Sequence, residues 1–353
     1  MTNKAKTRDD IRIVVVGLGN IGRRFLSVVE KKSAELATRY GLCLRLVGAA
    51  DSKGAAMAAK GLDIAAVIAL KENKQSIADY TDDAGGHGHA GLSPLELVQK
   101  VEADVLCEAT PVDTDTGEPG LGCMRAALNK GMHVVTANKG PLVLAYTELT
   151  RLACEKGVAF RFCGTVCGGL PAVNLGQRDL VGATISRLEA LPNLTTSFIL
   201  DKMAHGQSYA QALAAAQAQG CAEADPSLDV EGWDAANKLV ILANSVLGIP
   251  ATLSKVAVQG ITGVTQNDLA QANAEGKVIK LVASAVRQPN GAYTLTVAPT
   301  PLPAGHPLAQ LSGQQMGIVY HTDIYGTISA AILEEEPVPS AAAMLRDLIG
   351  IYA

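Results

Sequence analysis

The first half of the chain alternates short apolar runs with helical patterns. Apolar, β-branched runs predict strands at residues 11–16, 42–50, 104–109 and 133–136, and the intervening periodicity predicts helices at 21–36, 122–129 and 145–156. Strands that are apolar throughout are typical of a parallel sheet covered on both faces. Because crossovers between parallel strands are right-handed, we expect an α/β, doubly wound sheet of the Rossmann type.

The pattern changes after Lys156. Residues 162–171 are rich in glycine and irregular, and the rest predicts strands at 186–191, 293–297 and 317–320, with single helices at 198–219 and 233–247. A last helix at 340–352 is expected to pack back on the first domain. We therefore predict a dinucleotide-binding domain at 1–160, completed by 338–353, and a second α+β domain for substrate binding and dimerisation at 161–337.

The amino-acid composition and net charge argue against several classes of function. Apolar residues make up 48% of the 353 residues, aromatic residues make up only 4%, and the formal net charge is -4. Scarce aromatics and the absence of a basic block argue against a nucleic-acid partner. There are seven cysteines without a CxxC pair, no apolar leader and no apolar stretch of about 18 residues. We expect a reduced, cytoplasmic protein with no membrane span and no zinc cluster.

A glycine motif follows the first predicted strand and opens the first predicted helix. Gly17, Gly19 and Gly22, with Asn20 and Ile21 between them, form GxGxxG, which lets backbone approach a pyrophosphate at a helix N-terminus. A glycine turn without a ligand is the alternative. Asp51 ends the second predicted strand, where a carboxylate would accept hydrogen bonds from the adenosine ribose of NAD. Ser52 and Lys53 follow and would instead hold the 2′-phosphate of NADP, so the preference stays open.

Two further segments carry candidate chemistry. Asn138 and Lys139 follow the strand at 133–136, at the carboxyl edge where such sheets bind ligands. Asp234 and Lys238 are four residues apart on one predicted helix face, a spacing that on its own favours an ordinary surface ion pair.

Two motifs are interpreted as structural. The pair His87 and His89 lies in glycine-rich sequence and predicts a loop rather than a metal site. Cys163 and Cys167 are expected to be buried free thiols.

Five blocks in order resemble the short, monofunctional type of homoserine dehydrogenase. They are GLGNIG, ATPVDTDTGEP, VVTANKGPL, GGLPAVNLGQRDL and AEADPSLDVEGWDAANKLVILA, and together they span nearly the whole chain. The resemblance implies NAD(P)-dependent interconversion of L-homoserine and L-aspartate 4-semialdehyde by a homodimer. It also implies a place in threonine, methionine and isoleucine biosynthesis.

The resemblance implies a role for each matching residue. Lys238 looks like the family's catalytic lysine, Asp234 like its partner and Lys139 like a second lysine. Implied substrate-binding residues are Glu223, Asp229 and Thr195, with Glu223 binding the substrate ammonium. Implied cofactor contacts are Gly17, Gly19, Asn20, Ile21, Gly22, Asp51, Ser52, Lys53, Thr110, Pro111, Asn138 and Lys139.

Three departures from the family pattern keep alternatives open. Cys163 stands where an acid helps to hold a monovalent cation in some members, so no metal is predicted. Leu194 replaces a glycine next to the substrate segment, and Glu334 to Glu336 replace a glycine-rich stretch. The alternatives are a related oxidoreductase with another amino-acid-like alcohol or aldehyde, and an NAD(P)-binding sensor without turnover.

Overall fold

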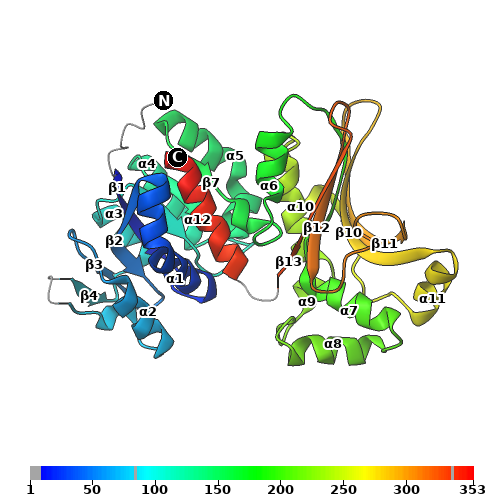
Figure 1. The fold of residues 1–353 in the computed structure, drawn as a ribbon, viewed down its shortest axis with the longest axis horizontal. Coiled ribbons are helices and arrows are strands. Elements are labelled where there is room, and N and C mark those ends of the chain that lie inside the picture. The colour runs from blue at the N-terminus through cyan, green and yellow to red at the C-terminus, as the bar shows by residue number, and fades with distance from the viewer. Residues whose placement is uncertain (1–8, 83–85, 335–337) are drawn as a thin grey trace. The chain divides into compact units, whose positions relative to one another are not determined.

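The chain divides into two compact units (Figure 1). The computed structural model describes residues 9–82, 86–334 and 338–353. Unit 1 comprises Met1–Gly169 and Glu336–Ala353, and unit 2 comprises Leu170–Glu335. Within the described ranges, no helix combines the length and the apolar character needed to cross a bilayer.

Unit 1 is built on one sheet with the order β4-β3-β2-β1-β5-β6-β7. Strands β2, β1, β5, β6 and β7 are parallel, with Val16 of β1 opposite Ala50 of β2 and Glu108 of β5. The carboxyl ends of these three strands therefore meet at one edge. The strands are β1 (Asp9–Val16), β2 (Leu42–Ala50), β3 (Gly54–Met57), β4 (His87–Ala90), β5 (Val105–Glu108), β6 (His133–Thr136) and β7 (Phe160–Arg161).

The antiparallel edge of this sheet corrects one prediction. His87 and His89 lie in strand β4, which pairs antiparallel with β3, and not in a loop. Gly88 explains the strand, because a Cβ there would lie 2.1 Å from the carbonyl oxygen of Ala78. The glycines allow the close approach of backbone that pairing at this edge requires.

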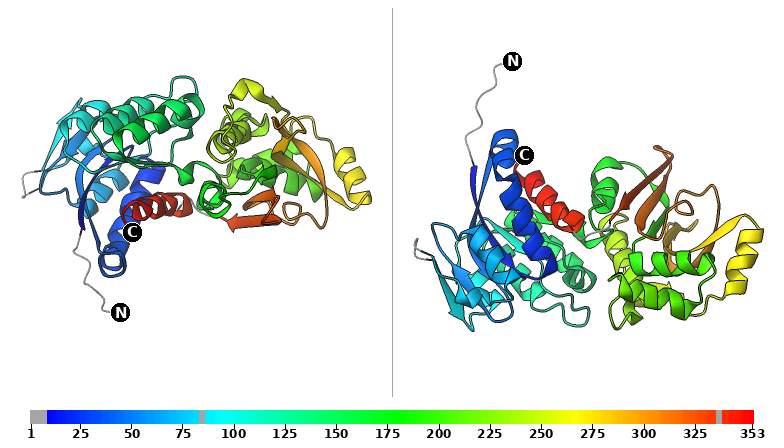
Figure 2. Two further views of the ribbon diagram at one scale, coloured as in Figure 1. Left: turned by 90° about the horizontal axis from the view of Figure 1, so that it is seen from above. Right: turned by 60° about the horizontal axis from the view of Figure 1, so that its bottom comes forward.

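Helices close the core of unit 1, and the C-terminal helix belongs to it. Helix α12 contacts α1, and both views of Figure 2 place them side by side. Met344 and Leu348 of α12 join Phe25 and Leu26 of α1 in one buried cluster. The helices are α1 (Asn20–Glu35), α2 (Ile64–Glu72), α3 (Pro94–Lys100), α4 (Gly120–Asn129), α5 (Lys139–Lys156) and α12 (Val338–Tyr352).

Unit 2 is built on a mainly antiparallel sheet with the order β13-β12-β8-β10-β11-β9. Only β11 and β9 pair in parallel among its described strands. Burial alternates residue by residue along the edge strand β13, as expected for a strand with one solvated face. The strands are β8 (Ile185–Leu191), β9 (Val256–Val258), β10 (Lys277–Arg287), β11 (Tyr293–Pro303), β12 (Gln315–Thr322) and β13 (Thr327–Leu333).

The predicted single helix at 198–219 is two helices. Gly206 adopts φ 93°, which ends the first helix, and Ser208 caps the next through the backbone N–H of Gln211. The capping box Ser208–Gln211 was readable in the sequence but was hidden by the alanine-rich composition. The helices of unit 2 are α6 (Ala172–Asn174), α7 (Leu194–Ala204), α8 (Tyr209–Ala218), α9 (Ser227–Val230), α10 (Trp233–Ser245) and α11 (Gln266–Ala274).

Candidate active site

A cavity of 590 Å³ lies at the carboxyl edge of the parallel sheet in unit 1. Such an edge, at the point where strand order reverses around β1, is where open α/β sheets bind ligands. Its walls come from the β1–α1 turn, the end of β2, α2 and the segment after β5. Predicted cofactor residues that line it are Gly17, Gly19, Asn20, Ile21, Asp51, Ser52, Thr110 and Pro111, whereas Gly22, Lys53, Asn138 and Lys139 do not.

Each of the three motif positions requires glycine for a different steric reason. Gly17 adopts φ 88°, and a Cβ there would lie 2.3 Å from the carbonyl carbon of Ala109. A Cβ at Gly22 would lie 1.9 Å from the carbonyl oxygen of Gly17, so helix α1 packs on the turn only without a side chain. A Cβ at Gly19 would meet no described atom within 4 Å, although Gly19 borders the cavity. Gly17 and Gly22 therefore shape the turn, and Gly19 leaves room for a ligand.

Asp51 is already surrounded by hydrogen-bond donors. Its Oδ1 accepts the backbone N–H groups of Lys53 at 2.8 Å and Gly54 at 3.2 Å, and its Oδ2 accepts Nζ of Lys71 at 2.5 Å and N–H of Ile77 at 3.0 Å. Burial raises the pKa of Asp51, but the hydrogen bonds from Lys71 and the backbone outweigh it and hold that pKa below its usual value. A carboxylate offers about four lone-pair positions, so these four donors occupy them.

A buried carboxylate that the sequence did not single out organises the segment after β5. Glu108 accepts hydrogen bonds from the backbone N–H of Thr110 at 2.8 Å, the hydroxyl of Thr136 at 2.7 Å and the amide of Asn138 at 3.3 Å. Burial raises the pKa of Glu108, although these donors favour its charged form. Glu108 thereby joins the predicted residues Thr110 and Asn138, which follow two neighbouring strands.

Lys139 stands at an electrostatically unfavourable position. It is the first residue of α5, and Asn138 caps that helix by accepting the N–H of Gly140 at 3.0 Å. The helix macrodipole is positive at this end, so a cation does not stabilise the helix there. The lysine is therefore not explained by helix formation.

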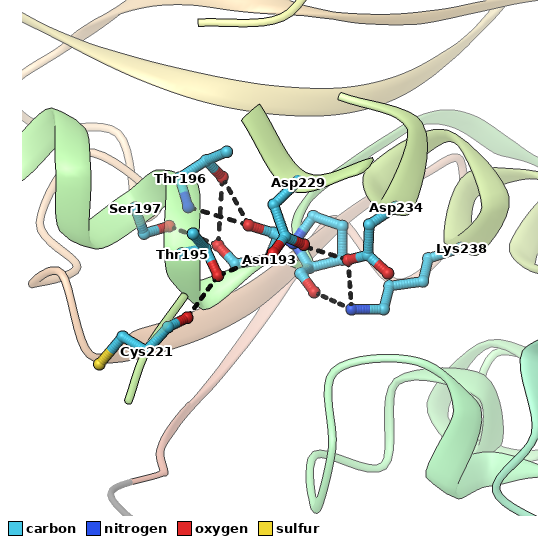
Figure 3. A network of polar contacts seen from close by, with 9 residues as sticks. Asn193, Thr195, Thr196, Ser197, Cys221, Asp229, Asp234 and Lys238 are labelled. Atoms are coloured by element: carbon cyan, nitrogen blue, oxygen red, sulfur yellow. Dashed lines mark hydrogen bonds and ion pairs between the residues drawn. The ribbon is translucent and has the colours of Figure 1, made fainter. Parts of the chain in front are cut away.

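Unit 2 gathers a second set of polar side chains around Asn193 (Figure 3). The amide nitrogen of Asn193 donates to Oδ1 of Asp229 at 2.6 Å and to Oδ2 of Asp234 at 2.7 Å. Its Oδ1 accepts the N–H of Thr196 and caps α7. One buried side chain thus links the start of α7 to α9 and α10, and holds two carboxylates close together.

Lys238 and Asp234 form an ion pair within α10. Nζ of Lys238 donates to Oδ2 of Asp234 at 2.8 Å and to the carbonyl oxygen of Pro192 at 2.6 Å. The side chains are only 16% and 7% exposed, so this is not the solvated surface pair that the spacing alone allowed. The ammonium is held in a fixed place beside the other polar groups (Figure 3).

Thr195 and Asp229 complete this cluster. The hydroxyl of Thr195 donates to the carbonyl oxygen of Cys221 at 2.6 Å and lies 3.1 Å from Oδ2 of Asp229. Burial and the nearby charge of Asp234 raise the pKa of Asp229. Within this cluster the carboxylates of Asp229 and Asp234 outnumber the single ammonium of Lys238. A cationic group would be favourable beside Asp229.

The structure brings together four of the five site residues predicted for this half of the chain, namely Lys238, Asp234, Asp229 and Thr195. The fifth, Glu223, is exposed, and no described hydrogen bond connects its carboxylate to the cluster. Sequence reasoning did not assign roles to Asn193 here, or to Lys71 and Glu108 in unit 1. Asn193 carried a signal, because an asparagine before a helical segment is a typical N-cap.

Similar proteins give this geometry its context. The family model for homoserine dehydrogenase matches residues 171–349. A homoserine dehydrogenase from Methanocaldococcus jannaschii is 36% identical over 96% of this chain and 98% of its own length. The chain belongs to the homoserine dehydrogenase family. An NAD(+)-dependent homoserine dehydrogenase from Pseudomonas canavaninivorans is 33% identical, over 97% of this chain and 96% of its own.

Solved structures agree with this family membership. The crystal structure of a putative homoserine dehydrogenase from Archaeoglobus fulgidus matches with a TM-score of 0.86 at 34% identity, covering 97% of this chain and 99% of that one. A hyperthermophilic archaeal homoserine dehydrogenase in complex with NADPH matches with a TM-score of 0.83 at 27% identity, covering 97% and 98%. Residues 1–116 also match the model for glutamate/leucine/phenylalanine/valine dehydrogenases.

The structure shows the surroundings of Cys163, Leu194 and Glu334, where the sequence departs from the homoserine dehydrogenase pattern. Arg346 donates to Sγ of Cys163 at 3.2 Å and to the carbonyl oxygen of Gly169 at 2.9 Å, so a positive charge stands beside Cys163. Leu194 is the half-buried first residue of α7. Glu334 is buried after β13, and Glu335 and Glu336 lie outside the described residues.

Proposed function

We propose that this chain catalyses the NAD(P)-dependent interconversion of L-homoserine and L-aspartate 4-semialdehyde. The observation that carries the proposal is the buried Lys238–Asp234 pair within a cluster of acids, in a chain of the homoserine dehydrogenase family. Oxidation of a primary alcohol needs a group that takes the hydroxyl proton and a carrier that takes the hydride. A fixed lysine is suited to the first task.

We assign the proton transfer to Lys238. In the oxidation direction its neutral amine takes the hydroxyl proton, and in reduction its ammonium returns that proton to the aldehyde oxygen. Asp234 and the carbonyl of Pro192 fix the amine in place. We assign Lys139 to the same reaction, as a second cation that polarises the reacting oxygen.

The acids of the cluster bind the ammonium of the substrate. Asp229 lies where a cation relieves the repulsion from Asp234, and Thr195 beside it is a further polar contact. Glu223 is assigned to the same task, and it reaches the substrate from the exposed segment before α9. Such carboxylates select a substrate that carries an ammonium group, such as a zwitterionic amino acid.

The cavity of unit 1 fits a dinucleotide. When bound, the nicotinamide accepts the hydride in oxidation and gives it up in reduction. Gly19, Asn20 and Ile21 offer the start of α1 to a pyrophosphate, and Thr110 and Pro111 border the space beyond it. Asn138 does not line the cavity but donates a hydrogen bond to the hydroxyl of Thr110. Gly22 and Lys53 are assigned to this site as well, although neither lines the cavity. Gly22 shapes the turn, and Lys53 is an exposed residue two positions after Asp51.

The saturated carboxylate of Asp51 affects the choice between NAD and NADP. A ribose hydroxyl gains little from Asp51, because its lone pairs are already used. Lys71 neutralises Asp51 and lines the cavity itself, so a 2′-phosphate meets no net negative charge there. We therefore expect the protein to accept both cofactors.

A direct assay tests the proposal. Purified protein is given L-homoserine with either NAD or NADP, and formation of reduced nicotinamide is followed by its near-ultraviolet absorbance. Reduction of either cofactor is expected, and it must stop when L-homoserine is replaced by L-norvaline, which lacks the hydroxyl. Cofactor binding without reduction on L-homoserine or on any other amino-acid alcohol contradicts the proposal.

We further propose a cytoplasmic homodimer that acts in threonine, methionine and isoleucine biosynthesis. The residues on the exposed face of β13 support a dimer, because none of them is charged. They are Thr327, Ser329, Ala331 and Leu333. Leu333 is 53% exposed, which is unusual for a leucine on a strand that faces only water.

A further inference from the structure

Three potential metal ligands converge in unit 2, away from the cluster around Asn193. They are Glu189, His306 and His321, and their ligand atoms all lie within 4.8 Å of one another. Oε2 of Glu189 is 2.9 Å from Nε2 of His321 and 3.3 Å from Nε2 of His306. The three residues are 117 and 15 positions apart in the sequence, so spacing gave no signal for this site.

The fold fixes each of these residues. Glu189 lies on β8 opposite Val319 of β12, and His321 is two residues further along β12, so both side chains stand diagonally on one face of the sheet. His306 follows β11 in a turn anchored by its N–H to the carbonyl of Pro303. Leu308 and Ala309, just after it, pack with Leu191 and Val319 in a buried cluster. The site is therefore built by three separate segments.

We propose that Glu189, His306 and His321 form a binding site for a divalent transition metal, with zinc as the favoured ion. Zinc bonds to imidazole nitrogen and carboxylate oxygen are about 2.0–2.2 Å long, which places tetrahedral ligands about 3.3 Å apart. The observed separations of 2.9 and 3.3 Å are close to this value. Two imidazoles select zinc, nickel or copper over magnesium and calcium, and water completes the coordination.

Neighbouring groups form hydrogen bonds with the Nδ1 atoms of both histidine ligands. Nδ1 of His321 lies 3.2 Å from the hydroxyl of Thr327, which accepts a hydrogen bond from the protonated Nδ1 when Nε2 binds metal. Nδ1 of His306 accepts the N–H of Leu308 at 3.2 Å, and this long hydrogen bond is given up on coordination. Metal binding competes with protons, so affinity falls as pH is lowered.

The exposure of the ligand side chains indicates how a metal ion would enter the site. His321 is 31% exposed, whereas Glu189 is 5% exposed, so an ion enters from the His321 side. A bound ion would tie β8 to β12 and to the turn after β11. Since Glu189 is four residues before Asn193, it would also stabilise the strand that leads to the cluster around Asn193. Thr327 belongs to the proposed dimer face, so binding is measured on the assembled protein.

The experiment uses chelator-treated, untagged protein. Zinc binding is measured by titration calorimetry, and cobalt is used as a spectroscopic substitute. The test variant is H306Q/H321Q, and the matched control is H87Q/H89Q on β4, where two exposed histidines have no third ligand among the described residues. We expect one zinc ion per chain, a rise in unfolding temperature with zinc, and binding at least about 100-fold weaker in the test variant only.

Three outcomes overturn the proposal, two of them in the zinc titration. One is the absence of saturable zinc binding, and the other is binding that H306Q/H321Q leaves unchanged. A cobalt spectrum with a thiolate charge-transfer band also overturns it, because the ion would then lie on a cysteine. If the double variant does not fold, the single change His321→Gln at the solvent side gives the same test.

Discussion

At the scale of single residues, Lys238 is the group whose chemistry can be separated from its structural role. Lys238→Arg keeps a positive charge beside Asp234, but a guanidinium does not release its proton near neutral pH. We expect kcat to fall by about 10²- to 10⁴-fold, the size typical of a lost general acid–base group. Cofactor affinity should be unchanged, because the cavity is lined by unit 1 residues. Steady-state kinetics and cofactor titration check both points.

The exposed Lys255 provides the control, since Lys255→Arg should leave kcat unaltered. Normal turnover of Lys238→Arg with an unchanged unfolding temperature would remove this lysine from the chemistry.

Asp229 gives a prediction about pH. Its folded-state pKa is raised, so its ionised form opposes folding. That penalty is fully present above the folded pKa and disappears as pH falls below the unfolded value of about 3.9. Asp229→Asn should therefore increase the free energy of unfolding near neutral pH, and the gain over the unsubstituted protein should shrink toward acid pH. Denaturant unfolding of both proteins across pH measures this difference.

The same substitution should raise the KM for L-homoserine, because it removes a charge opposite the substrate ammonium. A constant stability difference at every pH would show that Asp229 is not the group responsible.

The sequence predicted those site residues that have a local signal. Asp234 and Lys238 are one helical turn apart, so their proximity could be foreseen, but their burial could not. Asn193 lies 41 positions before Asp234, and nothing in the spacing indicated that its amide would join two carboxylates. Asp51 was assigned to the cofactor by position alone. The ion pair with Lys71 depends on where the fold places the end of α2, which only the folded chain shows.

At the scale of elements, the β1–α1 turn offers a matched pair of glycine substitutions. Gly22→Ala places a Cβ 1.9 Å from the carbonyl oxygen of Gly17, so α1 must shift. We expect a loss of about 1–3 kcal/mol in the free energy of unfolding, as for other overpacked sites. Gly19→Ala has room for its Cβ and should leave stability nearly unchanged while weakening cofactor binding.

Thermal unfolding and cofactor titration of the two variants distinguish these effects. Equal stability of the two variants would mean that Gly22 does not set the packing of α1 on the turn.

Element boundaries were predictable where periodicity changes and not where a single residue bends the chain. The strands at 42–50 and 133–136 have the bounds expected from their apolar runs. The helix expected from residue 145 begins at Lys139, because Ala145 has a non-helical φ of -138° that breaks the pattern without ending the helix. Strands β10 and β13 were not predicted individually. Strand β10 has a run of four buried residues instead of strict alternation, and β13 alternates between exposed and half-buried positions.

At the scale of the whole molecule, the proposed dimer depends on the uncharged exposed face of β13. Ser329→Arg together with Ala331→Arg adds two charges to this face without changing the half-buried residues Ile328 and Ile332 beside them. We expect the unsubstituted protein to have the mass of a dimer and the variant that of a monomer, because two unpaired cations per chain would have to be desolvated at the interface. Light scattering coupled to gel filtration measures both masses. A matched change, Thr296→Arg on β11 of the same sheet, tests whether the interface extends across it. A monomeric unsubstituted protein, or a dimer that tolerates both arginines on β13, would contradict this assignment.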